Sequence, residues 1–244
     1  MFCKHKKIYP AKQGVDYKTV PLRDFDLVLF SGGSTGASGL IEWLEKRRVG
    51  AGTFSHVGMI ITSKSLPFQG LEDGKLYIFE STQSGKLTDG VLNIEGESYL
   101  GSQIREFDQV MKGYDSNPNS AIAVRRLINN PLDTMELSNV KAIMSFLYGK
   151  YNHRRYEVDI FQLFEAMIPK LRVFRSKKIE NTFIFCSQLV ATVYKGFGLV
   201  SKNCNPGDVV PMDFVVEDED HMINRNIFHP VEYIRYMNFE TMNY

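Results

Sequence analysis

The spacing of apolar residues changes between the two halves of this chain, and this change limits the folds that the chain can adopt. The first half contains short apolar runs of strand length, at residues 26–30, 53–62, 75–81, 90–94 and 121–127. The second half contains stretches typical of helices, at residues 133–148, 158–167 and 186–197. No regular alternation of strands and helices runs through the chain, so the pattern predicts an α+β fold.

The sequence also predicts shorter elements and the extent of the domain. A further helix is expected over residues 38–48, and Pro211–Phe214 begins with a proline, which suits the first position of a helical turn. Residues 226–236 return to a strand-like composition. Because the sequence contains no internal repeat and no low-complexity linker, we expect a single domain over residues 21–244, preceded by a basic N-terminal extension at residues 1–20.

The composition of the 244 residues, 43% hydrophobic with a net charge of +1, predicts a packed core and gives no electrostatic basis for binding nucleic acid. The most apolar stretch, residues 183–200, is interrupted by polar side chains, so no transmembrane segment is expected; peripheral membrane contact and the oligomeric state stay open. The first ten residues lack the apolar part of a secretory signal, and three cysteines without regular spacing fit a reducing compartment. These features predict a soluble cytoplasmic protein.

Cys186 is a candidate nucleophile. It lies where a short apolar segment, Phe183–Phe185, passes into a helical stretch. A helix N-terminus stabilises a thiolate through its free N–H groups and its dipole, and the same N–H groups can bind the oxyanion of a tetrahedral intermediate. Cysteine is also among the most frequently buried residue types, so a packing role is the alternative interpretation.

His56 and Glu80 are candidate partners of this thiol. His56 stands inside an apolar run, where a histidine is costly to bury without partners and is suited to act as a general base. Gly58, two residues later, lies on the same strand face and leaves room beside the ring. If the two runs pair as antiparallel strands, Glu80 lies near His56 and accepts one ring N–H, which leaves the other nitrogen for the thiol. A structural histidine and a solvated glutamate are the alternatives.

The order of these residues resembles the circularly permuted papain-like (NlpC-type) superfamily of cysteine amidases and acyltransferases, in which the histidine strand precedes the cysteine helix. Its branches include YiiX-like bacterial proteins, poxviral proteins and the lecithin:retinol acyltransferase group. Residues 101–119 and 153–181 look like insertions into a minimal member. The segments similar to the family are, in chain order, Asp26–Phe30, Ser55–Met59, Phe79–Thr82, Gly149–Asn152, Phe185–Val190 and Pro211–Phe214.

The resemblance implies a permuted papain-like fold, with an antiparallel sheet or a small barrel packed against helices. It assigns Cys186 as the nucleophile and His56 as its base. Glu80 is then the residue that orients His56, and Tyr151 is given a substrate-binding or oxyanion role. The implied activity is hydrolysis of an amide, in a peptide or a lipid-linked substrate, through an acyl-enzyme and without a cofactor.

Three other functions stay open. The lipid-modifying branch of the superfamily suggests an acyltransferase on lipid substrates. Residues Gly32–Gly36 fit the G-x-S-x-G pattern of a serine hydrolase, with Ser34 as nucleophile, although few residues precede this serine and residues 31–39 resemble a long loop bordering a cleft. A ligand-binding module would keep the fold without turnover. The histidines and cysteines show no zinc-binding spacing, so no metal site is expected.

Overall fold

A computed structural model describes most of the chain. The described residues are 16–31, 54–82, 91–97, 99–115, 121–155, 184–215 and 225–235. The helices expected over residues 38–48 and 158–167, and the loop that holds Ser34, lie outside these ranges, as does most of the N-terminal extension expected at residues 1–20.

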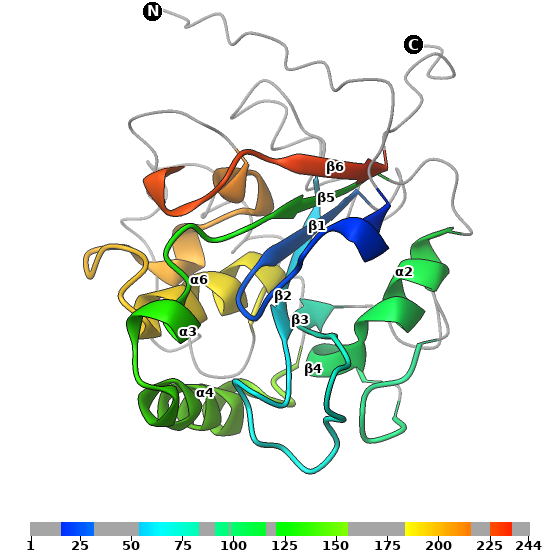
Figure 1. Cartoon of the computed structure of the whole chain (residues 1–244), viewed down its shortest axis with the longest axis horizontal. Coiled ribbons are helices and arrows are strands. Elements are labelled where there is room, and N and C mark those ends of the chain that lie inside the picture. Colours follow the sequence, from blue (N-terminus) through cyan, green and yellow to red (C-terminus); the bar gives the residue numbers. More distant parts are fainter. Residues whose placement is uncertain are drawn as a thin grey trace, which may run out of the picture.

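A single antiparallel sheet of six strands forms the centre of the described structure, in the order β4-β3-β2-β1-β5-β6 (Figure 1). The prediction of an α+β fold with an antiparallel sheet is therefore confirmed. The sheet is open, so the alternative of a small barrel is wrong: β4 and β6 form its two edges. The strands are β1 (Leu27–Ser31), β2 (His56–Ile61), β3 (Tyr77–Thr82), β4 (Gly101–Glu106), β5 (Ala121–Arg125) and β6 (Glu232–Arg235).

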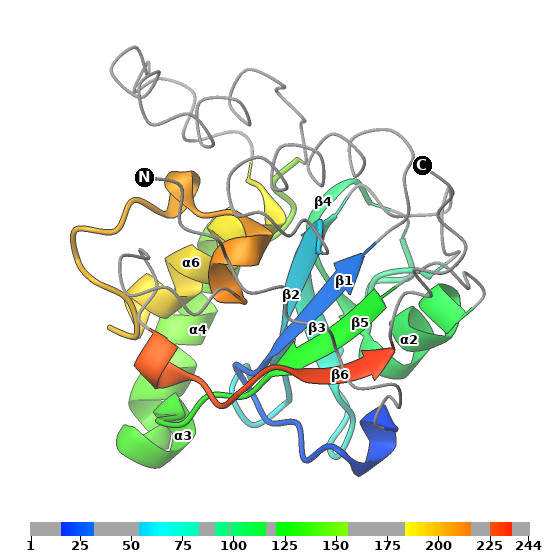
Figure 2. The same ribbon diagram turned by 90° about the horizontal axis from the view of Figure 1, so that it is seen from above.

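Helices cover both faces of the sheet. Figure 2 shows α4 and α6 on one face and α2 on the other. The described α-helices are α2 (Phe107–Asp115), α3 (Pro131–Thr134), α4 (Leu137–Tyr151) and α6 (Cys186–Gly196). Short 3₁₀ turns complete the fold, namely η1 (Tyr17–Thr19), η3 (Pro206–Asp208), η4 (Pro211–Phe214) and η5 (Arg225–Ile227). Among the described residues, no helix is long and apolar enough to cross a membrane.

Two apolar cores lie on opposite faces of the sheet because successive strand residues point to opposite sides. On β2, Val57, Met59 and Ile61 belong to the core under α4 and α6. Ile60 points the other way and packs in the core under α2, which includes Phe107. The central strands are buried on both faces, which is why their sequences are nearly continuous apolar runs.

Helix α6 follows the sequence prediction closely. It begins at Cys186, and the chain beyond its last residue, Gly196, turns at Gly198, which adopts a positive φ of 71°. Glycine adopts this conformation readily, and it commonly ends helices. The hydroxyl of Tyr194 donates to the carbonyl oxygen of Phe25 at 2.6 Å and ties the far end of α6 to the residues before β1.

Two predicted elements differ in the structure. Residues 91–94, the described part of the strand expected at 90–94, form no strand. The amide oxygen of Asn93 accepts the backbone N–H groups of Glu95 and Glu97 and closes a turn there, which competes with an extended strand. The helix expected over residues 133–148 is split into α3 and α4, with Glu136 at the N-cap of α4.

Strand β4 is a component of the sheet that the sequence analysis treated as part of an insertion. It pairs with β3 along its full length, from Tyr77 opposite Glu106 to Thr82 opposite Gly101. Gly101 allows the chain after α4 to approach closely, since a Cβ atom at Gly101 would lie 2.0 Å from the carbonyl oxygen of Arg154. The free edge of β4 thereby contacts the segment that leaves α4.

Candidate active site

Cys186 is the first residue of α6 and is 3% exposed. The first intrahelical bond described for α6 runs from Leu189 N to Phe185 O, at 2.9 Å. The backbone N–H groups that precede Leu189 in the first turn have no acceptor within the helix, as at any helix N-terminus. The thiol therefore lies at the positive end of the α6 dipole, beside free N–H donors.

Two serine hydroxyls hold the start of α6 in place. The hydroxyl of Ser81, on β3, donates to the carbonyl oxygen of Ile184 at 2.6 Å. The hydroxyl of Ser187 donates to the carbonyl oxygen of Val209 at 2.7 Å. Both bonds are buried, so Cys186 is flanked on each side by a fixed backbone attachment.

His56 is the first residue of β2 and contacts both other candidate residues. The thiol of Cys186 lies close enough to the ring to act on the imidazole and to raise the pKa of His56. Its Nε2 atom lies 2.5 Å from Oε2 of Glu80. Because Nε2 is engaged by the carboxylate, Nδ1 is the nitrogen that remains for the thiol. The structure thus brings together the three residues that the sequence analysis proposed as a triad; their catalytic role stays a prediction.

The ring of His56 is held by its neighbours on the sheet. Phe30, its cross-strand partner on β1, lies with its ring centroid 5.7 Å from that of His56, and Phe30 in turn stacks on Tyr114 of α2. Gly58 lies on the same face of β2, as expected. The space beside it is filled, because a Cβ atom there would lie 2.4 Å from Cδ1 of Ile78. The His56 side chain is only 13% exposed.

Glu80 also binds a residue that the sequence analysis did not identify. Arg105, on β4, places Nε 2.7 Å and Nη2 2.6 Å from Oε1 of Glu80. Neither side chain has any exposed area. Arg105 is brought to Glu80 because antiparallel pairing sets it opposite Ile78, two residues from Glu80 and on the same face of the sheet. Each carboxylate oxygen of Glu80 thus has a separate partner.

These contacts set the charges of the site. Burial alone raises the pKa of Glu80, but Arg105 and His56 outweigh it and lower this pKa to about 2. Burial lowers the pKa of His56, but its contacts with Cys186 and Glu80 outweigh that effect and raise this pKa to about 10. At neutral pH the geometry therefore favours an ionised Glu80 and a charged imidazolium at His56. A thiol beside an imidazolium and a helix N-terminus has the surroundings of a nucleophile.

Tyr151, the predicted substrate-binding residue, ends α4 and packs against the core that includes Cys186. Its carbonyl oxygen accepts a hydrogen bond from the hydroxyl of Ser102 on β4. Its ring lies beside two cations, Lys150 and Arg154. The hydrogen bond and the cation–π contacts of Tyr151 among the described residues are with these neighbours, and a role in binding substrate stays a prediction.

The residues that sequence analysis missed lacked a recognisable signal. Gly101–Glu106 contains a single large apolar residue, Ile104, and so gave no strand pattern. Without that strand, nothing in the sequence brings Arg105 to Glu80. Ser81 follows Glu80 directly and points to the opposite face, but a lone serine does not reveal its partner.

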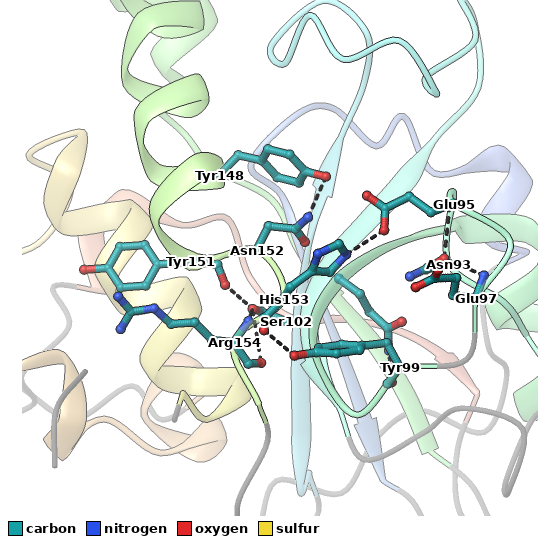
Figure 3. Close-up of polar contacts among 11 residues, drawn as sticks. Asn93, Glu95, Glu97, Tyr99, Ser102, Tyr148, Tyr151, Asn152, His153 and Arg154 are labelled. Atoms are coloured by element: carbon teal, nitrogen blue, oxygen red, sulfur yellow. Dashed lines mark hydrogen bonds and ion pairs between the residues drawn. The ribbon is translucent and has the colours of Figure 1, made fainter. Parts of the chain in front are cut away.

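A second histidine–carboxylate pair lies at the end of α4. Figure 3 shows His153 between Glu95 and Tyr99: Nε2 of His153 lies 2.5 Å from Oε2 of Glu95, and the Tyr99 hydroxyl donates to the His153 carbonyl oxygen. His153 has a positive φ of 58°, so these contacts hold a conformation that non-glycine residues seldom adopt. Both side chains of the His153–Glu95 pair are partly exposed. Among the described residues, no three His, Cys, Asp or Glu side chains gather as a metal site requires.

In comparisons with models of protein families and with curated protein sequences, no family model and no curated sequence matches this chain. The family resemblance therefore stands on the residues of the chain itself, and we treat it as a proposal.

Proposed function

We propose that this chain is a cysteine-nucleophile hydrolase of the circularly permuted papain-like class, acting on an amide in a peptide or a lipid-linked substrate. One observation carries the proposal: Cys186, at the N-terminus of α6, lies beside His56 and raises its pKa, and Nε2 of the same ring contacts Glu80. The chain order supports the permuted arrangement, since the histidine strand comes before the cysteine helix. The open antiparallel sheet packed against α6 is compatible with that class.

The first half of the proposed reaction forms an acyl-enzyme. The sulfur of Cys186 attacks the carbonyl carbon of the amide, and the carbonyl electrons move onto its oxygen. Backbone N–H groups of the first turn of α6 stabilise this oxyanion. When the C–N bond breaks, His56 donates its proton to the leaving amine, and the acyl group stays on Cys186 as a thioester.

The second half releases the acyl group. Neutral His56 removes a proton from a water molecule, whose oxygen attacks the thioester carbonyl. Collapse of the second tetrahedral intermediate expels the sulfur of Cys186 and yields a carboxylic acid. Glu80 accepts the hydrogen bond of Nε2 throughout, and it stays ionised because Arg105 and His56 stabilise its charge. If an alcohol or amine of a lipid takes the place of water, the same site transfers the acyl group to that lipid, which is the alternative function of a lipid acyltransferase.

Labelling with two reagents tests the proposal. Iodoacetamide should alkylate Cys186 of the wild-type chain, and a His56→Gln variant should lower the alkylation rate at neutral pH and shift its dependence on pH. Mass spectrometry locates the adduct. Alkylation of Cys186 that is slow and insensitive to His56→Gln would contradict the proposed pair.

A fluorophosphonate probe distinguishes the serine-hydrolase alternative, because such probes form adducts with activated serines. Ser34 should remain unlabelled if Cys186 is the nucleophile. A Cys204→Ser variant is a matched control for the thiol reagent. Cys204 is also a buried free cysteine, and burial is the largest of the effects that raise its pKa, so loss of Cys204 should leave the labelling unchanged. Labelling of neither Cys186 nor Ser34 would favour a non-catalytic binding module.

A further inference from the structure

The C-terminal end of α4 carries charged side chains that the proposed triad does not use. Nζ of Lys150 lies 5.2 Å from the centroid of the Tyr151 ring, and the guanidinium carbon of Arg154 lies 4.7 Å from the same centroid. Cation–π attraction holds each cation at the ring. Two positive charges near the same ring repel each other, so the arrangement favours an anion that lies close to both of them.

No carboxylate in the described part of the chain balances these two cations. There, Lys150 contacts the rings of Phe146 and Tyr151, and Arg154 contacts the Tyr151 ring and the carbonyl oxygen of Lys150. The stretch from residue 137 to residue 155 contains four Lys or Arg residues and no Asp or Glu. The positive charge is therefore local, although the whole chain has a net charge of only +1.

The guanidinium of Arg154 is oriented before any ligand binds. Its Nε atom donates to the carbonyl oxygen of Lys150 at 3.0 Å, and its plane lies near the Tyr151 ring. Within the described ranges, the two terminal nitrogens remain as a pair of donors, the arrangement that binds two oxygens of a phosphate. Figure 3 shows the side chains of Tyr151 and Arg154 extending together, away from the contact between His153 and Glu95.

This group of side chains adjoins the segment that leads to Cys186. The carbonyl oxygen of Arg155 accepts the backbone N–H of Ile184, two residues before Cys186. Ile184 is the residue whose carbonyl Ser81 holds. Tyr151 packs against the same core as Cys186. Lys150, Tyr151 and Arg154 therefore belong to the segment whose next residue, Arg155, is bonded to the backbone two residues before the proposed nucleophile.

We propose that Lys150, Tyr151 and Arg154 form an anion subsite that binds a phosphate group of the acyl substrate. Two cations held against one ring match the double charge of a phosphate monoester better than the single charge of a carboxylate. The link to substrate rests on the proposed function, whereas the anion subsite itself does not. The phosphate belongs either to a lipid headgroup or to a small phosphate ester.

Titration of the full chain with inorganic phosphate, followed by nuclear magnetic resonance or calorimetry, tests the subsite. Arg154→Gln and Lys150→Gln should each weaken phosphate binding by about tenfold, the effect of losing one charge-assisted hydrogen bond. Arg155→Gln is the matched control, since Arg155 is an exposed neighbour with the same charge. Absence of binding at millimolar phosphate, or an equal loss in Arg155→Gln, would overturn the subsite.

A short-chain phosphatidate, kept below its micelle concentration, distinguishes the two sources of phosphate. Tighter binding of phosphatidate than of inorganic phosphate, lost in Arg154→Gln, identifies a lipid headgroup; equal binding of the two identifies a small phosphate ester. Both outcomes support the subsite. If phosphate fails to bind while alkylation of Cys186 still depends on His56, only this inference is lost. If phosphate binds but alkylation does not depend on His56, only the proposed chemistry is lost.

Discussion

Arg105 and Glu80 form an ion pair that is closed to solvent, with Nη2 of Arg105 2.6 Å from Oε1 of Glu80. The second oxygen of the same carboxylate contacts Nε2 of His56. Glu80 thus connects a buried cation to the imidazole whose pKa is raised by the neighbouring Cys186. Arg105 acts on the thiol through two intervening side chains, which makes it a positioning residue for the proposed reaction.

Removal of Arg105 should leave an uncompensated charge in the interior. We expect Arg105→Gln to lower the free energy of unfolding by about 3–5 kcal/mol, because Glu80 is then buried without its cation. In a Glu80→Gln background the same substitution should lower it by much less. Urea denaturation of the four proteins measures this coupling. If Arg105→Gln lowered the free energy of unfolding equally in the wild type and in Glu80→Gln, the ion pair between Arg105 and Glu80 would not contribute to stability.

Arg105 also has a predicted effect that mere destabilisation would not produce. Arg105→Lys keeps the charge but loses the two-nitrogen contact with Oε1, so His56 should be held less firmly. The rate of alkylation of Cys186 should then fall and its dependence on pH should shift, under conditions where the variant is fully folded. An unchanged pH profile in a folded Arg105→Lys protein would limit Arg105 to a structural role.

The pKa of His56 is a direct readout of the triad. Contacts with Cys186 and Glu80 raise this pKa to about 10 against the opposing effect of burial. Either Cys186→Ala or Glu80→Gln should therefore lower it. Titration of the imidazole carbon or nitrogen resonances measures the pKa in each protein. A value near the ordinary one in the wild-type chain, unchanged in Cys186→Ala, would show that the two side chains do not interact in solution.

The same shifts make stability depend on pH in two separate ranges. His56 has a folded-state pKa raised to about 10, so its stabilising contribution is complete below its ordinary pKa of 6.5 and is lost as the pH rises through about 10. Glu80 has a pKa lowered to about 2, so its contribution is present above its ordinary pKa of 4.5 and is lost as the pH falls through about 2. Denaturant unfolding at a series of pH values measures this effect. The free energy of unfolding of the wild type should exceed that of His56→Gln by less and less as the pH rises towards 10.

Much of this site follows from the sequence because its parts depend on local patterns. The apolar run around His56 defines a strand, and the helical spacing after Cys186 defines a helix. The contact of His56 with Glu80 needs only that two consecutive strands pair antiparallel, as they do. Arg105 is different, since its place beside Glu80 depends on an edge strand without an apolar pattern.

The rest of the fold shows the same limit. A strand is expected around Asn93, but the side chain of this residue accepts hydrogen bonds from the backbone of Glu95 and Glu97 and so forms a turn. The spacing of apolar residues cannot predict such side-chain hydrogen bonds. The linkage between Ser81 and Ile184 joins residues 103 positions apart in the chain. Contacts of this kind appear only once the sheet and α6 have been packed together, so no local pattern predicts them.

Gly58 should not tolerate a side chain. A Cβ atom there would lie 2.4 Å from Cδ1 of Ile78 and 3.2 Å from Cβ of Glu80, in a region that is fully packed. Gly58→Ala should lower the free energy of unfolding by about 1–3 kcal/mol through overpacking. Ile78→Val removes Cδ1 but keeps Cγ1, which would lie 2.6 Å from the new Cβ atom. It should therefore restore only part of the lost stability in the double variant. Thermal or urea unfolding of the two single variants and the double variant checks this, and strictly additive losses would be inconsistent with the clash.

Ser81 is expected to affect the thiol through the backbone. Its hydroxyl donates to the carbonyl oxygen of Ile184 at 2.6 Å, and Ser81→Ala leaves that buried acceptor without its donor. The loss should lower the free energy of unfolding by about 1–3 kcal/mol and slow the alkylation of Cys186 by about tenfold, because the start of α6 is less firmly placed. Tyr194→Phe is the control: it removes a buried bond of equal length, to Phe25, at the other end of α6. Tyr194→Phe should destabilise the chain similarly but leave the alkylation rate of the folded protein unchanged; equal slowing in both variants would mean that Ser81 acts only through global stability.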